Sequence, residues 1–157
     1  MTGGQVASRC MEVGMNVSSI LAVKGRKVVT IEPTATLAAA AQSLSKHKIG
    51  AIVVLGPGNR ISGIISERDI VRSVASGGLK ALDQPVGQAM TREVATCGIN
   101  DSIEQLMQRM TDGKFRHLPV IEDGELAGMI SIGDVVKERL GEMEHETEAM
   151  RDYIRSA

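Results

Sequence analysis

The sequence contains almost no aromatic residues: one Phe, one Tyr and no Trp among 157 residues. Proteins that hold single-stranded nucleic acid without sequence preference stack the bases on exposed aromatic rings, and this chain has too few rings for such a surface. Its hydrophobic residues make up 43% of the chain, so we expect an aliphatic core of Val, Ile, Leu, Ala and Met.

No charge of one sign dominates either, because 18 Lys and Arg stand against 19 Asp and Glu. Nucleic-acid binders usually carry a basic excess, so a nucleic-acid partner is not expected. The two cysteines, Cys10 and Cys97, lie far apart without CxxC spacing, which indicates a reducing compartment or simple burial rather than a disulfide framework. The three histidines are scattered without ligand spacing, so no metal site is predicted.

Long apolar runs are missing as well. No stretch of 18 apolar residues is present, which argues against a membrane-spanning helix, and the N-terminus does not read as a signal peptide. We therefore expect a soluble, cytoplasmic protein without a membrane partner. No Ser-His-Asp, Cys-His or paired-carboxylate pattern stands out, and the glycine-rich stretches lack the lysine of a phosphate-binding loop, so no catalytic residue is predicted.

What the chain does have is an internal repeat. Residues 63–71 read GIISERDIV and residues 128–136 read GMISIGDVV, which share Gly, Ile, Ser, Asp and Val. Upstream, KIGAIVV at 48–54 matches KFRHLPV at 114–120, and VVT at 28–30 matches VAT at 94–96. The repeat extends over nearly all of residues 17–140, so the fold is built from two related units.

Each unit predicts the order strand, helix, strand, strand, helix. The predicted strands cover residues 28–32, 51–55 and 60–65 in the first unit and residues 94–97, 117–121 and 125–131 in the second. Apolar residues spaced i, i+3, i+4, i+7 predict the first helix of each unit, and Asp101 precedes Glu104 with the spacing of a capping box. The last helices begin at Glu67 and Ile132. A unit of about sixty residues buries little surface alone, so we expect the two sheets to pack together about a pseudo-twofold axis.

The repeated Ser-x-x-Asp allows two interpretations. Ser66 and Ser131 stand where a strand ends and a helix begins, and Asp69 and Asp134 lie in the first helical turn. A serine there caps the helix, and an acid in the first turn suits the helix dipole. The same geometry suits a nucleoside monophosphate: the helix N-terminus attracts phosphate, the carboxylate can accept both ribose hydroxyls, and the preceding glycine lets a ligand or backbone approach closely.

The two motifs in tandem, with RHLPV at 116–120 before the second, resemble a pair of CBS domains, the Bateman module. The resemblance covers residues 17–140 and is closest to small stand-alone bacterial members. It implies an α+β fold of two tandem β-α-β-β-α units, related by a pseudo-twofold axis with their sheets packed together, plus a C-terminal helix. The expected parts are a flexible tail (1–16), unit one (17–82), unit two (83–140) and an amphipathic C-terminal helix (141–157).

The resemblance also implies a non-catalytic regulatory module. Such a module binds adenine nucleotides (AMP, with NAD(H) or ATP as alternatives) in clefts between the units, senses energy or redox state, and forms a homodimer. The matching site residues are Thr30, Ala51, Ile52, Ser66, Arg68, Asp69, Thr96, Arg116, His117, Leu118, Pro119, Ser131, Ile132 and Asp134. Two alternatives stay open: a protein-interaction module for an unidentified effector, in which nucleotide only stabilises the fold, and an enzyme acting on the nucleotide.

The two predicted clefts are not equivalent. Arg68 precedes Asp69, whereas a glycine precedes Asp134. If Arg116 and His117 cross over as the family suggests, the basic groups converge on the Asp69 cleft and leave the other with a lysine at 46 or 48 at best. We therefore expect the two clefts to differ in affinity or in ligand.

The C-terminal segment carries an apolar stripe. Met143, Thr147, Met150 and Ile154 share one face of a predicted helix whose other faces are acidic. The stripe either packs on its own module or makes a dimer contact, and the sequence does not decide between the two.

Overall fold

The structure is a computed structural model that describes residues 15–156. Of the tail predicted over residues 1–16, all but the last two residues lie outside the described residues. Asn16 belongs to the folded part, because its side chain caps the first helix by accepting a hydrogen bond from the backbone N–H of Ser19 at 3.1 Å.

The predicted order of elements is confirmed in both units. The first unit runs β1 (Thr30–Ile31), α2 (Leu37–His47), β2 (Ala51–Leu55), β3 (Ile61–Ser66) and α3 (Glu67–Gly77). The second runs β4 (Cys97–Gly98), α5 (Ile103–Gly113), β5 (His117–Glu122), β6 (Glu125–Ser131) and α6 (Ile132–Ser156). Short helices α1 (Val17–Lys24) and α4 (Val86–Ala89) precede the two units, and the short 3-10 helices η1 (Pro57–Asn59) and η2 (Gly78–Asp83) fill connections.

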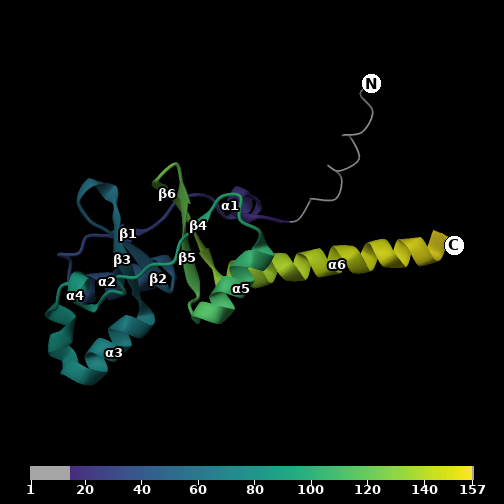
Figure 1. Cartoon of the computed structure of the whole chain (residues 1–157). Coiled ribbons are helices and arrows are strands. Elements are labelled where there is room, and N and C mark those ends of the chain that lie inside the picture. Colours follow the sequence, from purple (N-terminus) through teal and green to yellow (C-terminus); the bar gives the residue numbers. More distant parts are fainter. Residues whose placement is uncertain (1–14, 157) are drawn as a thin grey trace.

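The two sheets have the same topology. Their strand orders are β1-β2-β3 and β4-β5-β6, in which the first pair is parallel and the second antiparallel. Figure 1 shows the sheets together in the middle of the body, with the helices outside them. Ile52 and Val54 of β2 pack in the core of their own unit, and Ala51 and Val53, which point from the opposite face, are buried too. A strand buried on both faces fits an α+β fold in which the sheets face each other, as expected.

The entry helices are exchanged between the units. Val17 and Leu21 of α1 lie in the core of the second unit, and Val86 of α4 lies in the core of the first. The backbone N–H of Val17 donates to the carbonyl of Asp101 at 3.0 Å. The packed cores therefore differ from the contiguous segments 17–82 and 83–140, because an apolar pattern reports which face of a helix is buried but not which core covers it.

The exchange explains the glycine of each repeated motif. A β-carbon on Gly63 would lie 2.6 Å from the carbonyl oxygen of Thr91 and 2.7 Å from the sulfur of Met90. A β-carbon on Gly128 would lie 2.7 Å from a methyl group of Leu21. The absence of a side chain at these glycines was expected to let either a ligand or a backbone segment approach closely. In the structure, the exchanged segment is what packs against each glycine.

Two local predictions need correction. β1 and β4 are shorter than expected, since each forms only two ladder pairs with its neighbour. The capping box of α5 is one residue further along: Ser102, which is extended, caps the helix, and Gln105 completes the box. Asp101 accepts instead from the backbone N–H of Gly98 at 2.9 Å, which holds the turn before the helix.

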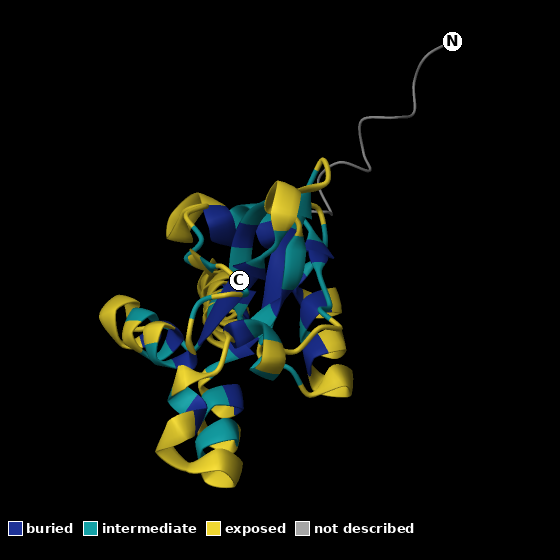
Figure 2. Ribbon diagram, turned by 90° about the vertical axis from the view of Figure 1, so that its left-hand side faces the viewer, coloured by how far each residue is buried: buried dark blue, intermediate teal, exposed yellow. Residues whose placement is uncertain are grey.

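The helix α6 is continuous from Ile132 to Ser156 and passes without a break through the boundary expected at residue 140. Its first turns contribute Val135 to the second core and pack against α1 and α5, and then it projects away from the body (Figure 1). In Figure 2, where α6 is seen nearly end-on, the visible turns of this part are coloured as exposed. Packing of the stripe on its own module is thus not seen, because Met143, Met150 and Ile154 are all exposed.

None of the described helices has the length and apolar content needed to cross a bilayer.

Candidate nucleotide site

The first Ser-x-x-Asp forms a closed cap at the start of α3. Ser66 ends β3, and its hydroxyl accepts a hydrogen bond from the backbone N–H of Asp69 at 3.4 Å. The Oδ2 atom of Asp69 accepts in return from the backbone N–H and the hydroxyl of Ser66, both at 2.9 Å. Asp69 is 9% exposed and is the only buried charged side chain found among residues 15–156. The capping interpretation therefore describes the bonding of this motif.

The second motif repeats the same bonds at the start of α6. Oδ2 of Asp134 accepts from the backbone N–H and the hydroxyl of Ser131, both at 2.9 Å, and the Ser131 hydroxyl accepts from the N–H of Asp134 at 3.2 Å. The first backbone N–H of each helix already has an acceptor. The N–H of Glu67 donates to the carbonyl of Gly50, and the N–H of Ile132 donates to the carbonyl of Arg116. The N–H of the next residue, Arg68 or Gly133, is the one that the described contacts leave for a phosphate oxygen.

Lys24 distinguishes the two motifs. Its Nζ donates to Oδ2 of Asp134 at 2.7 Å and to the carbonyl of Met129 at 2.8 Å. Lys24 reaches the second unit because α1 packs there, and for that reason it was not among the predicted site residues. One signal was available: in the repeat alignment that pairs residues 17–21 with 86–90, position 24 pairs with Glu93, so the copies carry opposite charges there.

The pKa of the Asp134 carboxyl lies below its usual value. Burial alone would raise this pKa, but the hydrogen bonds from Lys24 and Ser131 and the nearby ammonium charge together outweigh it. Asp134 is therefore ionised and already ion-paired before any ligand arrives. For Asp69, no ion pair is found in the part of the chain that the structure describes.

His117 lies between the two units. A β-carbon on Gly50 of the first unit would be 3.4 Å from its ring, so the side chain reaches across as the family pattern implies. Its pKa is lowered, first by burial and then by the positive charge of Lys24, against the opposing effect of Asp134 and Glu67. The ring is consequently neutral at pH 7. The expected convergence of Arg116 and His117 on the Asp69 cleft stays a prediction, in which His117 would act as a neutral hydrogen-bond partner; Arg116 beside it is exposed.

The remaining predicted residues fall into different environments. Ile52 and Leu118 are fully buried in the two cores, so their side chains face the packed interior rather than a cleft. Thr30 is exposed on β1, and Thr96 lies just before β4, where its carbonyl accepts from Arg109 at 2.6 Å. Ala51 at the start of β2 and Pro119 inside β5 are buried, Ile132 at the start of α6 is half-buried, and Arg68 is exposed.

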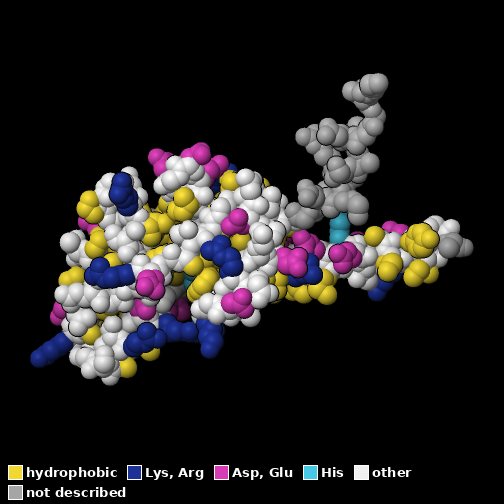
Figure 3. Space-filling view, viewed as in Figure 1, with side chains coloured by type: hydrophobic (Ala, Val, Ile, Leu, Met, Phe, Trp, Pro, Cys, Tyr) yellow, Lys and Arg dark blue, Asp and Glu magenta, His cyan; other side chains and the backbone are white. Residues whose placement is uncertain are grey.

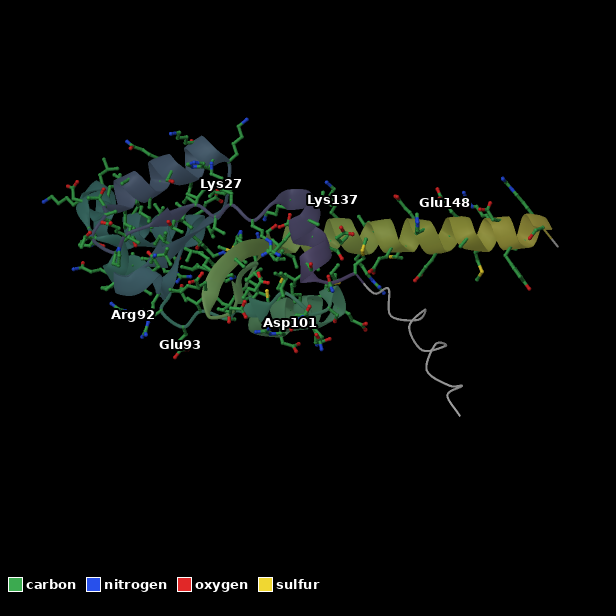
Figure 4. The ribbon with its side chains drawn as sticks, turned by 90° about the horizontal axis from the view of Figure 1, so that it is seen from above. Lys27, Arg92, Glu93, Asp101, Lys137 and Glu148 are labelled. Carbon is green, nitrogen blue, oxygen red and sulfur yellow. The ribbon has the colours of Figure 1, made fainter. Side chains whose placement is uncertain are left out.

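Two surface hollows lie away from both motifs. One runs along α6 beside Leu140 and Thr147, and the other lies between Arg26 and the β5–β6 turn. Figure 4 shows the side chains of α6 around Glu148 pointing into open space.

Within residues 15–156 no group of three or more His, Cys, Asp or Glu side chains comes close enough to hold a metal ion. Cys97 is buried, and this burial, with the nearby Asp101, raises the pKa of its thiol to about 11, so it is unreactive at neutral pH.

Comparison with known proteins identifies the class. The family model for the CBS domain matches residues 17–76 and again residues 86–141. The chain therefore belongs to the CBS-domain family and carries a tandem pair of these domains, as the sequence predicted.

Similar proteins come from bacteria, plants and archaea. A CBS-domain-containing protein from Agrobacterium tumefaciens is 48% identical and superposes with a TM-score of 0.79 over 82% of this chain and 96% of that one. A mitochondrial CBS domain-containing protein of Arabidopsis thaliana is 39% identical over 73% of this chain, which spans 58% of the plant protein. A CBS domain protein from Pyrobaculum aerophilum, solved in complex with AMP, is 31% identical, with a TM-score of 0.73 over 85% of this chain and 99% of that one.

Proposed function

We propose that this protein is a non-catalytic regulatory module that binds an adenine nucleotide, AMP in preference to NAD(H) or ATP, at the N-terminal ends of α3 and α6. The observation that carries the proposal is the duplicated geometry at Ser66–Asp69 and Ser131–Asp134, in which a carboxylate and a free backbone N–H share one helix start. A ribose diol can donate to the carboxylate while a phosphate takes the N–H. The AMP complex of the archaeal relative supports the same ligand class here.

The two sites differ in what a nucleotide must displace. Asp134 is ion-paired with Lys24, so a ribose there gains less from the carboxylate and competes with the existing ion pair. Asp69 has no ion pair among the described residues, and its hydrogen bonds there come from Ser66 alone. The exposed Arg68 stands next to it and can meet a phosphate. The site at Asp69 is therefore the tighter one for AMP.

The regulatory part of the proposal requires that nucleotide changes how the protein meets an effector. A ligand shifts a conformational equilibrium only as far as its affinities for the two states differ. The alternative, a protein-interaction module in which nucleotide merely stabilises the fold, predicts equal effector binding with and without AMP. An enzyme that acts on the nucleotide predicts products after incubation with AMP, ATP or NAD, and the proposal predicts unchanged nucleotide.

Thermal unfolding tests the ligand class. AMP at 100 times its dissociation constant should stabilise the protein by about 2.7 kcal/mol, which corresponds to a rise in melting temperature of roughly 5–10 °C for a domain of this size. The 2′,3′-dideoxy analogue of AMP is the matched control, since it keeps the base and phosphate but cannot donate to the aspartate. Equal shifts with both compounds would contradict the assigned role of Asp69 and Asp134, and no shift with AMP, ADP, ATP, NAD or NADH at millimolar concentration would remove the proposed function.

A further inference from the structure

The projecting part of α6 carries a continuous apolar seam with a seven-residue repeat. The seam residues follow one another at alternating steps of four and three and are all exposed: Val136, Leu140, Met143, Thr147, Met150 and Ile154. Steps of four and three are the a and d positions of a coiled coil, which assigns Leu140, Thr147 and Ile154 to position a. Figure 3 shows hydrophobic side chains along this helix.

The polar member of the seam is compatible with burial. The hydroxyl of Thr147 donates to the carbonyl of Met143 in its own helix at 2.9 Å. Its hydrogen-bonding requirement is thus met within one helix, and its methyl group can face a partner helix. The seam can be buried without leaving an unpaired donor.

The projecting part has little support of its own. Beyond Glu142, whose carboxylate accepts from the backbone N–H of Met15 at 3.2 Å, the side-chain hydrogen bonds of α6 stay within the helix among the described residues. An isolated helix of fewer than roughly 12–15 residues is marginal in water even with a favourable sequence. Residues 143–156 extend a helix that is already formed on the body, and a second helix along the exposed seam would support these last turns as well as cover the seam.

The charges beside the seam select the partner and its direction. The flanking e positions are Lys137, Glu144 and Arg151, and the flanking g positions are Arg139, Glu146 and Tyr153. In a parallel, in-register pair of identical helices, each g residue faces the e residue five positions further along the other chain. Arg139 then meets Glu144, and Glu146 meets Arg151, so the twofold axis produces four attractive contacts. In an antiparallel pair centred on the seam, Glu144 and Glu146 each face their own copies.

We propose that residues 136–154 of α6 form a parallel, two-stranded coiled coil with a second copy of this chain. This names a surface for the homodimer that the sequence led us to expect, and it does not depend on nucleotide binding. The proposal differs from dimerisation through the faces of the two modules, because its contacts lie on a helix that leaves the body.

The test is the mass of the full chain in solution at tens of micromolar, measured by sedimentation equilibrium. The parent should be a dimer, and Met143→Glu/Met150→Glu should weaken the dimer by roughly 100-fold or more, because each change places a charge in the apolar seam. The control His145→Glu/Ala149→Glu adds the same charges outside the seam and should remain dimeric. Both side chains of the test pair are exposed in the single chain, so its melting temperature at low protein concentration and its AMP-dependent shift should match those of the control.

Direction is tested by charge and by crosslinking. Arg151→Glu should weaken the dimer, and adding Glu146→Arg should restore it, since in the parallel pair these two positions face each other. In a Cys10→Ala background, Ile154→Cys should oxidise to a disulfide-linked dimer, because position 154 meets its own copy only in the parallel arrangement. A monomeric parent, which includes the outcome that residues 1–14 or another protein cover the seam, overturns the proposal. A dimer indifferent to the Met143→Glu/Met150→Glu pair, or one without the disulfide, overturns it as well.

Discussion

At the scale of single residues, the repeated motif is symmetric in its hydrogen bonds and asymmetric in its charge. Asp69 and Asp134 each accept two hydrogen bonds from the serine three residues earlier, but only Asp134 also accepts one from a lysine. A carboxylate that already accepts from a fixed ammonium group is a poorer acceptor for an incoming ribose than one without such a partner. Lys24 therefore gives the two aspartates different charge environments, in addition to the difference between Arg68 and Gly133 in the motifs themselves.

The Lys24–Asp134 ion pair predicts a pH-dependent contribution to stability. Lys24→Met keeps the aliphatic stem and removes the charge, and should lower the free energy of unfolding at pH 7 by about 1 kcal/mol, the range for a partly exposed ion pair. The folded-state pKa of Asp134 lies below the ordinary value of 3.8. The stabilisation is therefore present above that pH, and is lost as the pH falls through the folded-state pKa.

Urea unfolding of parent and variant between pH 7 and pH 3 measures this difference. Lys27→Met is the matched control, since Lys27 is exposed (Figure 4) and forms no ion pair in the described part of the chain. A stability difference between parent and Lys24→Met that stays constant as the pH falls would show that Lys24 acts through packing rather than through the Asp134 charge.

At the scale of elements, the glycines of the two motifs are spacers for exchanged segments, and the two spacers are not equally strict. The β-carbon added by Gly63→Ala would meet the carbonyl oxygen of Thr91, whose N–H and carbonyl both bond to Ile64 and cannot move without losing those bonds. The β-carbon added by Gly128→Ala would meet the terminal methyl group of Leu21, which can change rotamer.

We therefore expect Gly63→Ala to cost about 2–3 kcal/mol of unfolding free energy and Gly128→Ala less than about 1 kcal/mol. Gly141→Ala serves as the control: the residue lies within α6 with no atom near its would-be β-carbon, so alanine should stabilise the protein by about 0.5–1 kcal/mol. Chemical denaturation of the three variants gives the order directly. Equal costs at positions 63 and 128 would mean that the contact with the Thr91 backbone does not constrain Gly63.

The sequence predicts elements well where local chemistry determines them. The starts of α3 and α6 are predicted by a serine that can cap the helix and an acid three residues later that can accept from the serine's backbone N–H. The strands β2 and β6 are predicted by apolar runs between turns. The predicted start of α5 was one residue before the observed start, because Asp101 and Ser102 are both good caps and each has a polar partner three residues later. Only the backbone conformation at Ser102 decides between them.

At the scale of the whole molecule, the exchange of α1 and α4 is what the sequence did not predict. The repeat shows that the two units are alike, and an apolar face shows that a helix is buried, but neither states which unit covers it. The contact between Lys24 and Asp134 was not predicted for the same reason, since it is a consequence of the exchange. The exchange also ties the units together, because each core contains residues from both halves of the chain.

In the proposed function, each motif binds one nucleotide through its aspartate, and the site at Asp69 binds more tightly. Asp→Asn keeps the size of the side chain and removes the charge that accepts the ribose hydroxyls. A hydrogen bond to a charged group contributes about 1.5–3 kcal/mol, so each substitution should weaken its own site by roughly 10- to 100-fold or somewhat more. Loss of the cap costs about 1 kcal/mol of folding stability at either position, which does not alter affinity by itself.

The decisive measurement is calorimetric titration of AMP into the parent, Asp69→Asn, Asp134→Asn and the double variant. Asp134→Asn should keep the tighter binding event, Asp69→Asn should lose it, and the double variant should lose both. If the double variant binds AMP as tightly as the parent, the aspartates do not bind the ribose and the repeated Ser-x-x-Asp is a helix cap alone.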